Sequence, residues 1–141
     1  MLARAGLGRL GYRIEGDKLE CDAGAFHATA LPILPAIGQG AVGIEIRRDD
    51  DGTRKLVSAI DHGESHLCVR VERELLRRLD GDCRLPVAAL ATLDGGTLRA
   101  DAIVFPDDES LPPVRAHATG PATDPEAIAV SLFKQLQGGA R

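Results

Sequence analysis

The 141-residue chain has few aromatic side chains: three Phe, one Tyr and no Trp. Proteins that bind single-stranded nucleic acid stack bases on aromatic side chains, and aromatic cages hold cationic ligands, so both kinds of site are disfavoured. An excess of basic residues is also missing, because 17 Lys and Arg stand against 21 Asp and Glu, a net charge of −4. A nucleic-acid partner is therefore not expected.

Cysteine is scarce as well. Cys21, Cys68 and Cys83 are an odd number, and no two of them have Cys-x-x-Cys spacing. This set fits neither a disulfide framework nor a four-cysteine zinc site, and it indicates the reducing cytoplasm. His62 and His66 lie four residues apart, but a solvated helix start explains them better than a metal site, so no metal is expected.

Long apolar runs are missing too. None approaches the roughly 20 residues that a membrane-spanning helix needs. Charge and glycine interrupt the first residues, Met1-Leu2-Ala3-Arg4-Ala5-Gly6, so they do not resemble a signal peptide. Neither a membrane span nor a membrane partner is expected.

Residues 61–141 carry a strong pattern of secondary structure. A helix capped by Asp61 and stopped by Gly81 is predicted from an apolar stripe at helical spacing, formed by Leu67, Cys68, Val71, Leu75 and Leu79. Asp94-Gly95-Gly96 predicts a hairpin between strands at 87–93 and 97–105, and 114–119 alternates as a third strand. Asp124-Pro125 begins a last helix that ends at Gly138-Gly139. The expected fold class is α+β: an αβββα domain whose three-stranded antiparallel sheet is covered by helices on one face.

The first 60 residues give a weaker pattern. Residues 1–11 indicate a short helical segment closed by Gly11, and 12–30 are predicted to be loop. Ala41–Arg47 has apolar residues on both faces and predicts a buried strand. A connecting helix is expected within 51–60, from about residue 53.

Two segments are candidates for chemistry. Gly38-Gln39-Gly40-Ala41 opens a strand rather than a helix and lacks a lysine, which favours a hinge or a close backbone approach over a phosphate-binding loop. Cys83 lies in the loop before the first hairpin strand, where Arg84 favours its thiolate and Asp82 opposes it. A catalytic nucleophile is the less favoured interpretation of a lone cysteine that has no evident histidine partner.

Taken together, these segments resemble the porphobilinogen deaminase (hydroxymethylbilane synthase) family. The motifs that carry the resemblance are LARAGLGRLG at 2–11, LPAIGQGAVGIEIR at 34–47, ERELLRRLDGDCRLPVAAL at 72–90 and LRADAIVFPDD at 98–108. The resemblance implies a transferase of tetrapyrrole and haem biosynthesis. Such enzymes condense four porphobilinogen units, with loss of ammonia each time, into the linear tetrapyrrole hydroxymethylbilane.

The resemblance also implies a covalent cofactor. In the family the growing chain of pyrroles hangs on a dipyrromethane joined by a thioether to a loop cysteine, and Cys83 falls on that position. Arg9 falls on an arginine that faces the carboxylates of cofactor and substrate, for which a guanidinium is suited. The matching turn beside the cofactor consists of Gly38, Gln39, Gly40 and Ala41. Porphobilinogen and the linear pyrrole intermediates are the implied small-molecule partners.

Two departures from the family pattern stand out. Asp82 replaces the second of the two glycines that usually precede the cysteine. Two consequences are open: its carboxylate repels the carboxylates of the cofactor, or the loop is strained if this position needs positive φ. Ile46 replaces a cysteine in the strand, a core substitution that conserves volume and has little consequence.

No segment matches the family's blocks that supply the catalytic aspartate, in the N-terminal domain, and most of the arginines and the lysine that bind substrate. The chain is therefore expected to hold no catalytic residue and to be inactive alone. Its expected parts are 1–50, a remnant of domain two and the strand that returns to domain one, the connecting helix 51–60, and the cofactor-bearing domain 61–141. The missing N-terminal domains, in cis or in trans, are expected partners, and Ala41–Arg47 is expected to drive self-association. The alternative is a non-catalytic binding or assembly module that keeps the third-domain fold.

Overall fold

The computed structural model describes residues 7–27, 31–81, 85–108 and 110–139. The chain divides into two compact units, Met1–Ile33 and Leu34–Arg141, and each is described by itself.

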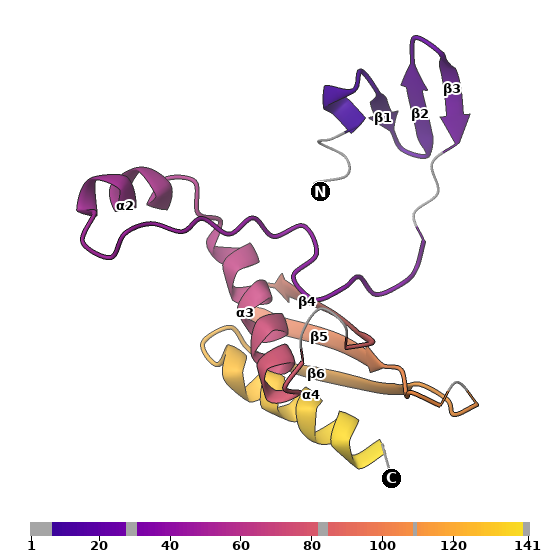
Figure 1. The fold of residues 1–141 in the computed structure, drawn as a ribbon, viewed down its shortest axis with the longest axis vertical. Coiled ribbons are helices and arrows are strands. Elements are labelled where there is room, and N and C mark those ends of the chain that lie inside the picture. The colour runs from indigo at the N-terminus through magenta and orange to yellow at the C-terminus, as the bar shows by residue number, and fades with distance from the viewer. Residues whose placement is uncertain (1–6, 28–30, 82–84, 109, 140–141) are drawn as a thin grey trace. The chain divides into compact units, whose positions relative to one another are not determined.

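The first unit contains a small antiparallel sheet (Figure 1). A helical turn at residues 7–9 precedes the strands β1 (Arg13–Glu15), β2 (Lys18–Cys21) and β3 (Gly24–His27). The prediction of a loop at 12–30 is therefore wrong for 13–27, and residues 28–30 lie outside the described residues. Strands of three or four residues are too short to show a period, and the order comes from pairing across tight turns, as at Gly16 with φ +60°. The register aligns Ile14, Leu19 and Phe26 on adjacent strands.

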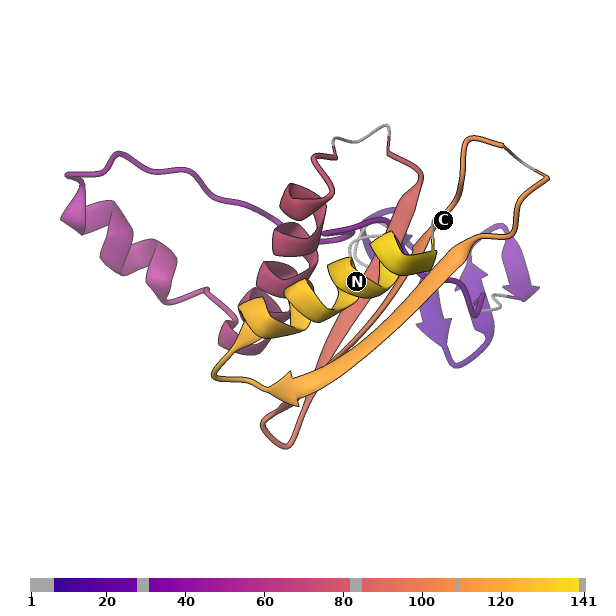
Figure 2. The same cartoon turned by 90° about the horizontal axis from the view of Figure 1, so that it is seen from below.

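The second unit confirms the predicted αβββα order. Its elements are α2 (Asp51–Ser58), α3 (Gly63–Arg78), β4 (Val87–Asp94), β5 (Thr97–Val104), β6 (Val114–Pro121) and α4 (Pro125–Gly139). The strands form an antiparallel sheet in the order β4-β5-β6. The predicted hairpin turn is present, with Gly95 and Gly96 at φ +53° and +81°, as a two-residue turn of type I′ requires. Helices α3 and α4 cover one face of this sheet (Figure 2).

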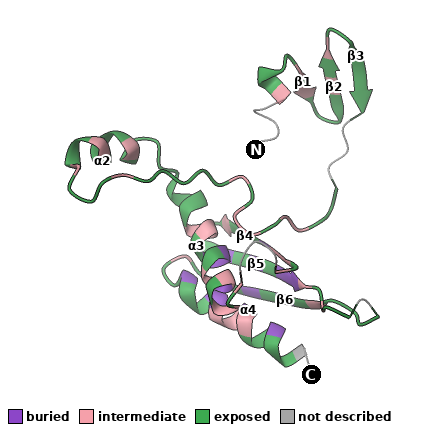
Figure 3. Ribbon diagram, in the orientation of Figure 1, coloured by how far each residue is buried: buried purple, intermediate pink, exposed green. Residues whose placement is uncertain are grey.

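The core lies between these two helices and the sheet, where the buried residues gather (Figure 3). Alternate residues of β5 supply Leu98, Ala100 and Ala102 from one sheet face, as period-2 alternation predicts. The helices contribute the predicted stripes, of which Val71, Leu75, Ile128, Leu132 and Leu136 are buried. Small alanines on the sheet face let the helices approach closely, and burial of this apolar surface stabilises the unit.

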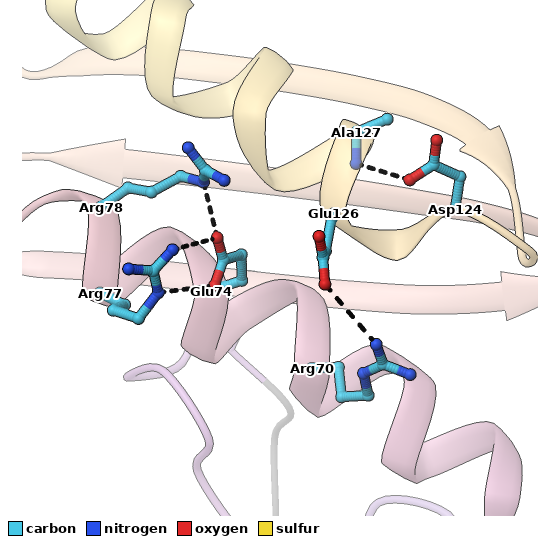
Figure 4. Close-up of polar contacts among 7 residues, drawn as sticks. All are labelled: Arg70, Glu74, Arg77, Arg78, Asp124, Glu126 and Ala127. Carbon is cyan, nitrogen blue, oxygen red and sulfur yellow. Dashed lines mark hydrogen bonds and ion pairs between the residues drawn. The ribbon is translucent and has the colours of Figure 1, made fainter.

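The helix ends are capped by side chains. Asp124 Oδ1 accepts a hydrogen bond of 3.0 Å from the Ala127 N–H at the start of α4, as predicted (Figure 4). At the start of α3 the predicted cap, Asp61, is wrong by one residue. His62 Nδ1 accepts from the Ser65 N–H at 3.3 Å, while Asp61 Oδ1 lies 3.2 Å from His66 Nδ1. The side chain of Asp61 is therefore engaged by a histidine rather than by the helix backbone.

Glu74 organises the last turns of α3 (Figure 4). Arg77 donates two hydrogen bonds of 2.8 Å to its two carboxylate oxygens, and Arg78 Nε lies 2.8 Å from Oε1. The Glu74–Arg78 pair confirms the predicted i,i+4 contact. The hydrogen bonds from Arg77 lower the pKa of Glu74 to about 2, and the charges of both arginines act in the same direction.

On each edge of the second sheet, some backbone groups have partners from outside the sheet. On the β6 edge, the Gln135 side chain accepts from the His117 N–H at 3.2 Å and donates to the His117 carbonyl at 2.9 Å. On the β4 edge, the Pro35 carbonyl accepts from the Ala89 N–H at 3.1 Å, and Ala36 forms an isolated antiparallel bridge with Ala88. Such contacts occupy the backbone groups that would otherwise pair with another strand.

The predicted strand at Ala41–Arg47 is wrong for this chain. Residues 41–47 are described and form no strand, and Val42 and Ile44 are 72% and 51% exposed. A strand exists only where a neighbour takes its backbone hydrogen bonds. In the described part of the second unit no strand pairs with this segment, so its apolar pattern has no sheet to enter.

Candidate functional site

The turn at Gly38–Ala41 is the first sequence-predicted feature of the site. The Gln39 N–H donates to the Ala36 carbonyl and the Ala41 N–H to the Gly38 carbonyl, each at 3.0 Å. Two successive β-turns result, with Gly38 at φ +68° and Gly40 at φ +84°. Positive φ at the third residue of each turn is what glycine supplies.

Among the described residues, no other segment of the chain closely approaches these glycines on the side where a Cβ atom would lie. A methyl group on either Gly38 or Gly40 would meet no atom of the described residues within 4 Å. The glycines are therefore required by the backbone angles and not by crowding.

Glu72 anchors this turn, and the sequence prediction missed it. Glu72 Oε2 accepts a hydrogen bond of 2.8 Å from the Gly38 N–H, and Oε1 accepts one of 3.0 Å from the Ala91 N–H of β4. The residue is only 6% exposed. One carboxylate on α3 thus joins the turn before α2 to the edge strand of the sheet.

A signal for Glu72 was present in the sequence. Glu72 lies four residues after Cys68 and three before Leu75, which places it on the apolar stripe of α3 and not on its polar face. A charged residue at a buried helical position needs specific partners. Those partners are backbone N–H groups, which sequence patterns do not identify.

The loop that contains Cys83 starts at the end of α3. The Gly81 N–H donates to the Leu76 carbonyl at 3.1 Å and the Asp80 N–H to the Arg77 carbonyl at 3.3 Å, the paired hydrogen bonds of a Schellman motif. Asp80, at φ +49°, occupies the left-handed position that glycine usually takes. The predicted helix stop is thus displaced from Gly81 to Asp80.

Gly81 has a packing role instead. A methyl group there would lie 2.5 Å from Leu85 Cδ2 and 2.8 Å from Leu76 Cδ1. Glycine at this position therefore leaves room for the side chains of Leu76 of α3 and of Leu85. Cys83 itself, with Asp82 and Arg84, lies outside the described residues.

The predicted site residues are divided between the two units. The turn at Gly38–Ala41 and both ends of the Cys83 loop belong to the second unit, in which Glu72 of α3 contacts Gly38 and Ala88 of β4 pairs with Ala36. Arg9 belongs to the first unit, in the helical turn at residues 7–9, and is exposed. Its predicted role toward a carboxylate stays a prediction.

Cysteine and histidine side chains outside the predicted site are further candidates for chemistry. Cys21 and Cys68 are free, and burial raises the pKa of the Cys68 thiol, with Glu72 and Glu64 adding to the effect. His117 Nδ1 lies 2.9 Å from Asp101 Oδ1 across two neighbouring strands.

Within the described ranges no group of three His, Cys, Asp or Glu side chains has the arrangement of a metal site. Nor does any helix described here have the length and apolar character to cross a membrane.

Comparison with known families assigns both parts of the chain. Residues 66–138 match the family model described as "Porphobilinogen deaminase, C-terminal domain". Residues 1–55 match the one described as "Porphobilinogen deaminase, dipyromethane cofactor binding domain". Arg9 and the Gly38–Ala41 turn lie in the second of these matched ranges, and Glu72 and Cys83 lie in the first. The name of the second model contains the dipyrromethane cofactor that is expected from the sequence.

Two curated relatives bear the name porphobilinogen deaminase. The chain is 45% identical over 104 residues to that of Pelotomaculum thermopropionicum, covering 73% of this chain and 33% of the relative. It is 50% identical over 109 residues to that of Sphingopyxis alaskensis, covering 77% and 32%. The chain thus spans about a third of the length of these relatives. On these matches and on the αβββα architecture, the chain belongs to the porphobilinogen deaminase family.

Proposed function

We propose that this chain is the cofactor-bearing C-terminal part of a hydroxymethylbilane synthase that works in the cytoplasm. The complete enzyme condenses four porphobilinogen molecules into hydroxymethylbilane and releases one ammonia for each. In this proposal Cys83 holds the dipyrromethane through a thioether. When bound, that group supplies the end on which the pyrrole chain grows.

One observation carries the proposal. The Gly38 end of the turn contacts α3, and Ala36 just before it pairs with β4; α3 and β4 are the two elements between which Cys83 lies in the sequence. The bridge residue Ala88 follows Cys83 by five positions, and Glu72 precedes it by eleven. Two segments far apart in the sequence, both assigned to the cofactor by resemblance, thus share one scaffold.

The chemistry of the described residues fits such a cofactor. Gly38 and Gly40 leave open space beside the backbone, which a flat pyrrole ring needs for close approach. The exposed guanidinium of Arg9 is suited to bind acetate and propionate carboxylates in a bidentate manner. Cys83 needs no histidine partner, because its sulfur is a tether and takes no part in proton transfer.

The proton transfers are assigned to residues that this chain does not contain. In the described part of the site, Glu72 is the carboxylate that contacts the turn, and each of its oxygens accepts a hydrogen bond from a backbone N–H group. Neither oxygen is therefore open to a ligand. We therefore propose that the remainder of the enzyme, in cis or in trans, supplies the catalytic aspartate. The chain alone is expected to be inactive.

The test is complementation with an N-terminal portion of a porphobilinogen deaminase. The mixture is assayed for porphobilinogen consumption, first with the wild-type chain and then with the variants Cys83→Ser and Cys21→Ser. Consumption is expected with the wild-type chain and with Cys21→Ser, and is expected to disappear with Cys83→Ser. Activity that survives Cys83→Ser would refute the proposed tether. No activity from two folded parts would instead favour a non-catalytic binding or assembly module.

A further inference from the structure

Glu72 is the one charged residue among the buried residues of the described chain. A carboxylate removed from water costs free energy unless hydrogen bonds replace its hydration. Here each oxygen receives one backbone N–H, at 2.8 Å from Gly38 and at 3.0 Å from Ala91. The two donors lie 34 residues before and 19 residues after Glu72, so the side chain connects three segments that are distant in sequence.

Both contacts require an acceptor. An ionised carboxylate only accepts, with two oxygens, whereas a glutamine amide has one accepting oxygen and one donating nitrogen. At this position a glutamine would direct its NH₂ group at one of the two N–H donors. Replacement by glutamine therefore loses one hydrogen bond and sets two donors against each other.

The Ala91 contact alone would have a simple structural purpose. Ala89 and Ala91 have N–H groups that face outward from the β4 edge, and Pro35 satisfies the first of them. Capping Ala91 needs only one of the oxygens of Glu72. The second oxygen is directed to Gly38, at the centre of the double turn, and this contact fixes the turn rather than the sheet.

We propose that Glu72 is a positioning residue that locks the Gly38–Ala41 turn to the domain that contains Cys83. With Pro35 and Ala36 already on the edge of β4, the hydrogen bond to Gly38 fixes the next residues of the same segment against α3. The turn then moves with α3 and β4 as one body. The importance of this lock for pyrrole condensation rests on the proposed function, but the lock itself does not.

Amide hydrogen exchange measured by NMR on the 141-residue chain tests the lock directly. In the wild-type protein the Gly38 and Ala91 amides are expected to be protected. In Glu72→Gln their exchange should accelerate by roughly tenfold or more, which is the effect of losing a hydrogen bond to a charged group. The amides of Val71, Leu75 and Leu132 report whether the core is intact, and they should change far less.

Glu74→Gln is the matched control. It removes the same charge from the same helix, two residues away, but Glu74 contacts arginine side chains and not the turn. An unprotected Gly38 amide in the wild-type protein would overturn the proposal even if Glu72→Gln failed to fold. Equal Gly38 exchange in Glu72→Gln and Glu74→Gln, with intact cores, would overturn it as well.

A second readout separates the lock from the cofactor. In the complemented enzyme, Glu72→Gln is expected to lower kcat by tenfold or more while cofactor occupancy at Cys83, read by intact mass, equals that of Glu74→Gln. Equal kcat in the two variants would refute a role in positioning. If the wild-type mixture is inactive, the proposed function fails, and the exchange measurement still decides whether the lock exists.

Discussion

The replacement Asp80→Gly is expected to stabilise the second unit. Asp80 adopts φ +49° at the end of α3, where its N–H donates to the Arg77 carbonyl. An L-residue in the left-handed region costs about 1–2 kcal/mol, somewhat less for Asp than for most side chains. A carboxylate at the negative end of a helix costs about 0.3–1 kcal/mol more.

Glycine removes both costs but adds entropy to the unfolded chain, which offsets about 0.5–1 kcal/mol. The net expectation is stabilisation by about 1 kcal/mol, equivalent to a rise in Tm of about 4 °C or more for a unit of this size. Thermal unfolding followed by circular dichroism at 222 nm measures it, because α2, α3 and α4 all belong to this unit.

Two further variants separate the causes. Asp80→Asn removes the charge but keeps a side chain that tolerates positive φ, so its Tm should lie between those of wild type and Asp80→Gly. Asp80→Ala removes the charge but raises the backbone penalty, because alanine tolerates positive φ less well than Asp, so the two effects offset each other and its Tm should stay close to that of wild type and below that of Asp80→Gly. A Tm for Asp80→Gly at or below that of wild type would refute the reasoning.

Three other predictions concern the core, acid stability and association. Leu132 is 1% exposed, so Leu132→Ala should lower the free energy of unfolding in urea by about 2–5 kcal/mol, whereas Leu56→Ala, at a residue 75% exposed, should change it by less than about 0.5 kcal/mol. The folded-state pKa of Glu74, about 2, lies below its ordinary value of 4.5. The stability from its arginine contacts is therefore fully present above pH 4.5 and is lost as the pH falls towards 2, so Glu74→Gln should flatten the acid unfolding curve in that window; an unchanged slope would count against these ion pairs. The exposed Val42 and Ile44 should promote self-association through Ala41–Arg47 in sedimentation equilibrium, and a double lysine variant should reduce it; a wild-type monomer at high concentration would exclude this interface.

The fold of the second unit was predictable because its signals are local and agree with each other. A two-residue turn at Gly95-Gly96 pairs Asp94 with Thr97 and so fixes the register of β4 and β5, in which Leu98 lies opposite Leu93. Asp124-Pro125 marks the start of α4. Where sequence reasoning failed, the deciding partner was distant or absent. Ala41–Arg47 has the composition of a strand, but a strand forms only beside another.

The same distinction applies to the site. The turn at Gly38 could be found from its glycines, and the sequence resemblance pointed to Cys83. Glu72 was missed because its partners are the backbone N–H groups of Gly38 and Ala91, which carry no signal of residue type. Its position on the apolar stripe of α3 is the sequence signal that indicates a buried charged residue.

The claim that Cys83 carries the cofactor is tested most directly by intact mass and peptide mapping. The chain is produced together with an N-terminal portion of the enzyme, in cells that synthesise haem. A covalent dipyrromethane is expected on the peptide that contains Cys83, present in Cys21→Ser and absent in Cys83→Ser. An unmodified Cys83 thiol in the wild-type chain, with both parts folded, would contradict it.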